Sequence, residues 1–185
     1  MNLLLALSAS AVFVPAASAD HVRPTALYRA LLATPIPAAS VPSGFSAPVG
    51  AQKAAVPPRE KLHHALGVVQ IFLTGGLDGG VAYGAGAYYN VFPNHQDAVA
   101  DYRAAPSAGQ AGTPRSFPTP GRIVNSSLPN GGTKYIAVEY VDGNVSVFAY
   151  LAAVGENPLP RHALPRVLSL GRFTLNHLER ARGTR

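Results

Sequence analysis

The chain has 185 residues, a formal net charge of +6, 48% hydrophobic residues and no cysteine. This hydrophobic fraction excludes a globally disordered chain, and the lack of cysteine excludes disulfides, thiolate metal sites and thiol catalysis. Residues 161–185 hold six arginines against one glutamate, so most of the positive charge is expected on one basic surface.

An apolar and small-residue run covers residues 3–14 and is followed by Pro15 and the triplet Ala-Ser-Ala at 17–19. This pattern is typical of a secretory signal peptide with an A-x-A cleavage site. The run is shorter than the ~20 residues that span a bilayer. We therefore expect a signal peptide over residues 1–19, cleavage after Ala19, and a secreted or periplasmic protein with no transmembrane span after cleavage.

After the signal peptide, the sequence predicts a short amphipathic helix over residues 24–32. Residues 34–58 are rich in Pro, Ala and Ser, which favours an extended, partly polyproline tether. Residues 20–60 are thus expected to form a short helix and a tether, and residues 61–185 a single compact domain.

The compact domain is predicted to open with a hairpin of strands 62–73 and 81–92, joined by a glycine-rich turn centred between Leu77 and Asp78. Gly84 and Gly86 interrupt the second strand. Glycines inside a strand indicate a bulge or the close approach of another group.

A helix capped by Asn94 and stopped by Pro106 follows, and then a long Gly/Pro loop over 107–121, which we expect to cover a site. Three further strands (122–128, 134–141 and 144–153) and a helix over 163–181 complete the chain. The order ββαβββα predicts an α+β fold with a single antiparallel sheet of about five strands and helices mainly on one face. A sheet with helices on both faces is the alternative.

The last helix divides into two arcs at 100° per residue. The arc predicted to pack on the sheet contains Leu164, Val167, Leu168, Gly171, Leu175 and Leu178. The opposite arc contains Arg166, Ser169, Phe173, Asn176, His177 and Arg180. Phe173 is therefore predicted to be exposed among basic residues, and Arg166, Phe173, His177 and Arg180 form a candidate surface for an anionic envelope component or an acidic protein. No nucleic-acid motif accompanies the charge, so nucleic acid is not an expected partner.

Tyrosines are concentrated in the predicted strands. The candidate ligand-binding residues are Tyr83, Tyr88, Tyr89, Tyr135 and Tyr140. Amphipathic rings of this kind can line a site for an apolar or sugar-like ligand, although tyrosine also simply fits half-buried sheet surfaces.

Histidines lie at the outer ends of the first hairpin. The predicted pairing brings His63 and His64 near His95, with Asp97 and Asp101 in the following helix. Imidazoles with a carboxylate can bind zinc or a similar divalent metal. Adjacent strand residues point to opposite faces, so at most one of the first two histidines can join His95. Ordinary strand-end histidines are the alternative.

No motif indicates an enzyme class, because the chain lacks a G-x-S-x-G elbow, an H-E-x-x-H pair and a phosphate loop. The favoured interpretation is an exported, non-catalytic binding or interaction domain, possessing no cofactor and associated with the cell envelope. The alternative is a metal-dependent enzyme or metal-binding protein that uses His63, His64 and His95.

Overall fold

The computed structural model describes residues 23–46, 52–56, 65–75, 77–78, 81–105, 110–127, 133–153 and 157–183. The expected signal peptide, His63 and His64 lie outside these residues. The helices are α1 (Pro24–Ala33), α2 (His95–Ala104) and α3 (Ala163–Ala181), with a short 3-10 turn η1 (Ala38–Ser40). The strands are β1 (Phe45–Ser46), β2 (Gln52–Val56), β3 (Gly67–Gly75), β4 (Leu77–Asp78), β5 (Val81–Val91), β6 (Gln110–Gly112), β7 (Gly121–Ser127), β8 (Lys134–Asp142) and β9 (Val145–Ala153).

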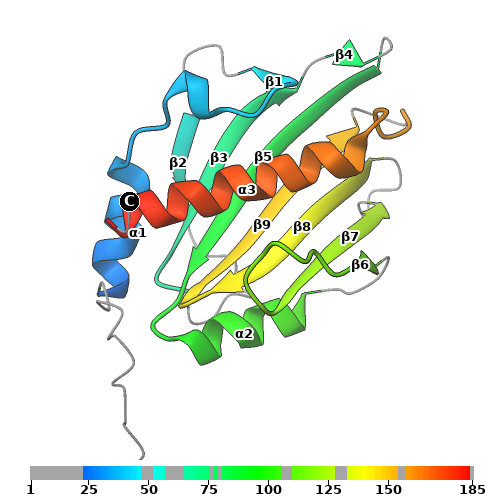
Figure 1. Ribbon diagram of the computed structural model, residues 1–185. Coiled ribbons are helices and arrows are strands. Elements are labelled where there is room, and N and C mark those ends of the chain that lie inside the picture. Colours follow the sequence, from blue (N-terminus) through cyan, green and yellow to red (C-terminus); the bar gives the residue numbers. More distant parts are fainter. Residues whose placement is uncertain are drawn as a thin grey trace, which may run out of the picture.

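All the strand pairs are antiparallel, and the main path of the sheet runs β1-β3-β5-β9-β8-β7-β6 (Figure 1). This confirms the predicted α+β fold with a single antiparallel sheet. Three of the nine described strands (β1, β4 and β6) have only two or three residues. The longer strands exceed the expected number by one, because the proline-rich segment contributes β2.

Strand β2 lies in the segment that was expected to be a tether. It pairs with β3 over its whole length, from Gln52 opposite Phe72 to Val56 opposite Val68. Its Lys53 donates from Nζ to the carbonyl oxygens of Leu31 and Leu32 at 3.3 and 2.6 Å and also to that of Thr34. An ammonium at a helix C-terminus satisfies carbonyls that have no partner inside the helix, so β2 and α1 stabilise one another.

The first hairpin has a different register from the expected one. Gly67 lies opposite Val91, whereas a turn centred between Leu77 and Asp78 would have placed His64 there. Strand β5 pairs with β9 without interruption from Tyr83 to Val91. Of the two alternatives for Gly84 and Gly86, a bulge or a close approach, the bulge is therefore wrong.

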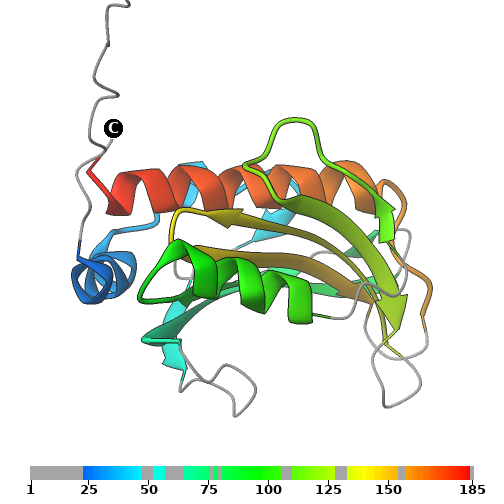
Figure 2. The same cartoon turned by 90° about the horizontal axis from the view of Figure 1, so that it is seen from below.

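Helices α1 and α3 cover one face of the sheet, and α2 packs at the end of the other face (Figure 2). We call these the helix-covered face and the open face. Helix α2 begins as predicted, because the Asn94 side chain accepts from the Asp97 N–H at 2.9 Å. Its Ala98 packs on Phe92 and Val141. Since two of the three helices share a face, the prediction of helices mainly on one face is confirmed.

Helix α3 is rotated about a quarter turn from the orientation that its leucines predicted. Its buried residues are Val167, Leu170, Gly171, Phe173, Thr174, His177 and Leu178. Gly171 lets the helix approach closely, because a Cβ there would lie 2.5 Å from a methyl group of Val138. The leucine arc proposed for the core includes Leu164, which is instead 44% exposed.

Candidate functional site

The predicted tyrosine site is divided between the two faces of the sheet. Tyr83, Tyr89 and Tyr140 lie on the helix-covered face and are at most 4% exposed. Tyr88 and Tyr135 lie on the open face and are half-buried. The expectation that all five share one ligand site is therefore wrong, because the alternation of a strand sends neighbouring side chains to opposite faces.

On the helix-covered face, Tyr83 is a structural link. Its hydroxyl donates to the Gly44 carbonyl oxygen and accepts from an Arg166 N–H, both at 2.5 Å. Its ring also meets Phe45 edge to face, with 6.2 Å between the centroids. These contacts join Gly44 and the start of β1 to β5 and α3.

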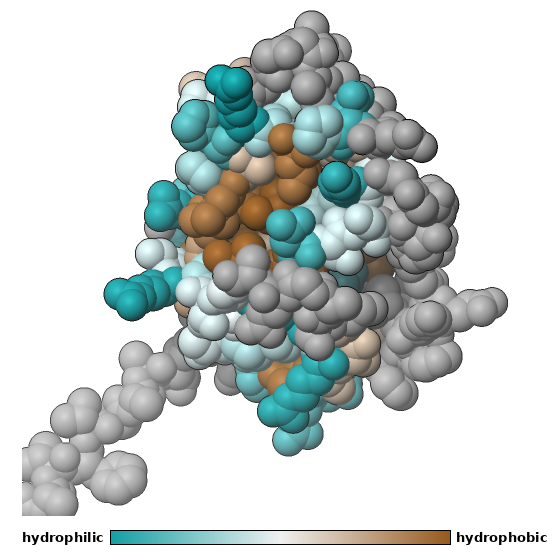
Figure 3. Space-filling view, turned by 90° about the vertical axis from the view of Figure 1, so that its right-hand side faces the viewer, coloured by the Kyte–Doolittle hydropathy of each residue, from teal (hydrophilic) through white to brown (hydrophobic). Residues whose placement is uncertain are grey.

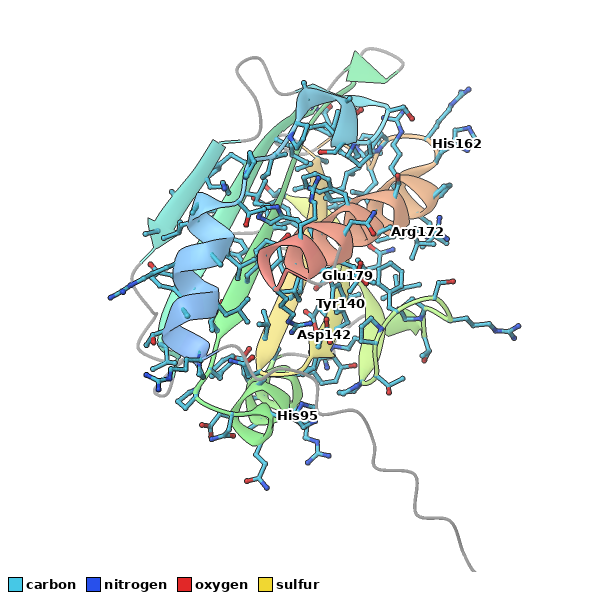
Figure 4. The ribbon with its side chains drawn as sticks, turned by 60° about the vertical axis from the view of Figure 1, so that its left-hand side comes forward. His95, Tyr140, Asp142, His162, Arg172 and Glu179 are labelled. Carbon is cyan, nitrogen blue, oxygen red and sulfur yellow. The ribbon has the colours of Figure 1, made fainter. Side chains whose placement is uncertain are left out.

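Tyr89 and Tyr140 form hydrogen bonds from the sheet to Thr174 in the middle of α3. Tyr89 donates to the Thr174 carbonyl oxygen at 3.1 Å, and the Tyr140 hydroxyl lies 2.9 Å from Thr174 Oγ1. Figure 4 shows Tyr140 between the sheet and α3. Burial raises the pKa of both phenols. Both groups are therefore neutral hydrogen-bonding members of the core.

His177 and Phe173 belong to the same core, which corrects their assignment to an exposed surface. His177 is fully buried, its Nε2 is 3.3 Å from the Leu31 carbonyl oxygen, and its ring lies 5.8 Å from that of Tyr89. Phe173 is 4% exposed. Polar Thr174 and His177 can occupy the buried arc because each has a hydrogen-bond partner there. Phe173 lies on the same arc of the helix and is therefore buried with them.

The two arginines of the predicted docking surface are also half-buried. Arg166 is half-buried against Tyr83, with its guanidinium carbon 5.1 Å from the ring centroid. Arg180 is half-buried, and its Nε and Nη2 atoms are buried with no hydrogen-bond partner among the described residues. The predicted surface of Arg166, Phe173, His177 and Arg180 is therefore not an exposed basic face.

The open face carries a cluster of aromatic rings that we call the aromatic platform, made of Tyr88, Phe148 and Tyr150. The centroids of Tyr88 and Tyr150 are 5.9 Å apart with planes at 20°, and those of Phe148 and Tyr150 are 5.7 Å apart at 28°. Tyr135 meets Phe148 at its edge, at 6.0 Å and 66°. All four rings are half-buried.

Gly86 allows the Tyr150 ring of the platform to lie close to the sheet. A Cβ at this position would lie 2.9 Å from the Tyr150 hydroxyl and 3.1 Å from its ring. The Tyr150 ring therefore lies against the backbone of β5, and a side chain at position 86 would push this ring away from the sheet. This confirms the predicted close approach at a strand glycine. The planes of Tyr88 and Phe148 lie 20° and 28° from that of Tyr150 and are tilted by 40° from one another.

Polar groups border the platform on two sides. Gln70 donates from Nε2 to the Tyr88 hydroxyl at 2.8 Å. At the α2 end, the Asp101 carboxylate is hydrogen-bonded by Ser146 and by Asn90, the latter at 3.4 Å. Burial raises the pKa of Asp101, and these two hydrogen bonds partly oppose the shift.

A buried ion pair continues the cross-strand row of the platform. Tyr88 pairs with Phe148, Phe148 with Glu139, and Glu139 with Arg122. Arg122 Nε donates to Glu139 at 2.5 Å, and its guanidinium carbon lies 4.4 Å from the Tyr102 ring centroid. Burial raises the pKa of Glu139, although Arg122 acts against this shift. The pair holds α2 and β7 at the border of the aromatic rings.

The described residues between β6 and β7, part of the loop that was expected to cover the tyrosines, lie on the helix-covered face instead. Between β6 and β7, residues 113–120 arch beside α3 (Figure 2). Phe117 packs on Tyr140, with 5.5 Å between centroids. This part of the loop therefore closes the core at the edge of α3 and does not cover the platform.

The metal hypothesis is carried by residues that the structure describes only in part. His95 is exposed at the start of α2 (Figure 4), with Nδ1 2.6 Å from the Gly143 carbonyl oxygen. Asp97 accepts from the Asn94 side chain at 2.9 Å. Within the described ranges, no three His, Asp or Glu side chains gather as a metal site. A site that includes His63 or His64 stays a prediction.

Sequence reasoning missed Phe148 and Gln70 as members of the ligand-binding set. Phe148 and Tyr150 are two residues apart on β9. Strand alternation therefore places Phe148 on the same face as Tyr150, and this signal could have identified it. Gln70 could not have been found in this way, because its approach to Tyr88 depends on the register between β3 and β5.

None of the helices in the described ranges has the length and hydropathy needed to cross a membrane. In comparisons with known sequences, no family model and no curated protein matches the chain. Its function is therefore argued from the geometry above.

Proposed function

We propose that this protein is a non-catalytic binding domain whose aromatic platform takes a ring-shaped ligand with hydroxyl groups, such as a sugar unit. The observation that carries the proposal is the cluster of Tyr88, Phe148 and Tyr150 on the open face, in which the rings of Tyr88 and Phe148 both stack with that of Tyr150. Binding sites commonly combine an apolar or aromatic surface with a few placed polar groups.

The chemistry of the platform and its border fits such a ligand. A sugar ring has an apolar C–H face that can lie on an aromatic ring, and hydroxyl groups at its edge. Gln70, Asn90 and Asp101 border the platform and offer amide and carboxylate groups to those hydroxyls. No described atom lies within 4 Å of the position that a Cβ on Gly84 would occupy, so the described part of the chain leaves room beside Tyr150.

Export would place this domain next to extracellular and envelope polysaccharides. The apolar run over residues 3–14 and the expected cleavage after Ala19 support this location as part of the proposal. An envelope component is accordingly the class of ligand that the proposal favours.

Titration calorimetry with chitotriose and maltotriose tests the proposal, with the dye anilinonaphthalene sulfonate as an apolar probe. We expect one of the sugars to bind, and Phe148→Ala to weaken it at least about tenfold, since stacking on one ring contributes on the order of 1 kcal/mol or more. Leu164→Ala is the matched control, because Leu164 is exposed on α3, away from the platform.

Binding of the dye alone, lost in Phe148→Ala, would replace the sugar by an apolar ligand. No binding of any probe, or equal binding by Phe148→Ala and the control, would contradict the proposal.

A further inference from the structure

Three leucines form a stripe along α3 at the border of the core. Leu164 is 44% exposed, and Leu168 and Leu175 are half-buried, packed against the core on one side. At 100° per residue they share one side of the helix with Gly171. A Cβ on Gly171 would lie 2.8 Å from the Phe117 ring, so this side of α3 borders the loop over residues 113–120.

Exposed arginines surround this stripe. Arg115 lies on the bordering loop, Arg161 just precedes α3, and Arg172 lies on the outer side of the helix, and all three are exposed. Figure 4 shows Arg172 pointing away from the sheet. Figure 3 views the molecule from the side of β6, β7 and the start of α3, and it shows a hydrophobic patch bordered by hydrophilic side chains. We call Leu164, Leu168, Leu175, Arg115, Arg161 and Arg172 the leucine–arginine surface.

We propose that the leucine–arginine surface docks on a membrane surface with anionic lipid headgroups. Guanidinium groups bind phosphate through paired, charge-assisted hydrogen bonds. An apolar stripe flanked by basic residues is the pattern of helices that lie in the membrane interface. The leucines enter the boundary between headgroups and acyl chains, and the arginines contact phosphates around them. The positive charge at this end of the chain favours anionic over neutral membranes.

The surface is separate from the aromatic platform, because it lies on the side of α3 and the platform lies on the opposite face of the sheet. A domain docked through α3 would leave the platform directed away from the membrane. This inference therefore does not depend on the identity of the platform ligand.

Vesicle co-sedimentation of the full chain tests the proposal, with phosphatidylcholine vesicles that contain 30% phosphatidylglycerol or none. Arg161→Ala/Arg172→Ala is compared with the control Arg23→Ala/Arg29→Ala, which removes two exposed charges from α1 and the residue before it. Because residues 3–14 are apolar, binding to neutral vesicles is measured alongside and subtracted.

We expect the first variant to lose about tenfold of its partitioning to anionic vesicles and the control about twofold or less, since the favourable interaction is strongest for basic groups close to the membrane surface. Leu164→Ser should weaken partitioning severalfold with an unchanged melting temperature. Equal losses in the two double variants would overturn the proposal, as would wild-type protein that shows no preference for anionic vesicles. The latter result would leave an acidic protein as the partner of this surface.

Discussion

The two faces of one sheet use the same residue type for different purposes. On the helix-covered face, the hydroxyls of Tyr89 and Tyr140 are hydrogen-bonded to α3 and both side chains are fully buried. On the open face, Tyr88 and Tyr150 lie nearly parallel and half-buried, with only α2 at one end among the described helices. A tyrosine-rich sheet therefore combines a hydrophobic core that contains hydrogen-bonded tyrosines on one side with a half-buried aromatic surface on the other.

The difference between the two faces should be largest in the stability effects of substituting two neighbouring residues, Tyr88 and Tyr89. Tyr89→Ala should lower the free energy of unfolding by about 4 kcal/mol, because it removes a fully buried ring and its hydrogen bond to α3. Tyr88→Ala should cost about 1 kcal/mol, because its ring is half-buried. Urea denaturation measures both values. Equal losses would break the distinction between the faces.

A second difference concerns pH, because the helix-covered face contains a buried histidine. Burial lowers the pKa of His177 to about 4, whereas an unfolded histidine titrates near pH 6.5. The unfolded chain thus binds this proton first as the pH falls. The contribution of neutral His177 is complete above about pH 6.5 and is lost progressively toward about pH 4, by about 3 kcal/mol.

Urea denaturation between pH 7 and pH 4 tests this expectation. His177→Gln should reduce the loss of stability over this range, because it removes the titrating group. The slope against pH is the readout, since the substitution itself can alter stability. Identical profiles for the wild type and His177→Gln would contradict the assignment.

The smallest predicted difference in stability is between alanine variants of two glycines of β5 on the open face. Gly86→Ala should cost about 1–2 kcal/mol and alter the near-ultraviolet circular dichroism of the tyrosines, because its Cβ would lie 2.8 Å from the Ile71 carbonyl oxygen and 2.9 Å from the Tyr150 hydroxyl. Gly84→Ala should change stability by less than about 0.5 kcal/mol, because its Cβ meets no described atom within 4 Å. Equal spectra for the two variants would contradict the assignment of Gly86 as the residue that lets the Tyr150 ring lie close to the sheet.

Local patterns predicted the elements of the compact domain well. Helix α3 has the expected bounds, and α2 begins at the predicted Asn94 cap. These predictions succeed because capping, turns and strand alternation depend on nearby residues.

The predictions that failed depend on packing between distant residues. The orientation of α3 is set by the fit of Gly171 against Val138 and by the partners of Thr174 and His177. Helical periodicity predicts the buried side of a helix from the hydrophobicity of its residues alone. It therefore contains no information about these tertiary contacts. The prediction of one site for five tyrosines failed because strand alternation divides these rings between the two faces of the sheet.

The most direct test of the central claim is to record the ring signals of the eight tyrosines by nuclear magnetic resonance while adding the trisaccharide that calorimetry identifies. The account predicts changes at Tyr88, Tyr135 and Tyr150 and none at Tyr83, Tyr89 and Tyr140. Changes confined to the buried group, or none at saturating sugar, would contradict the assignment of the open face as the binding site.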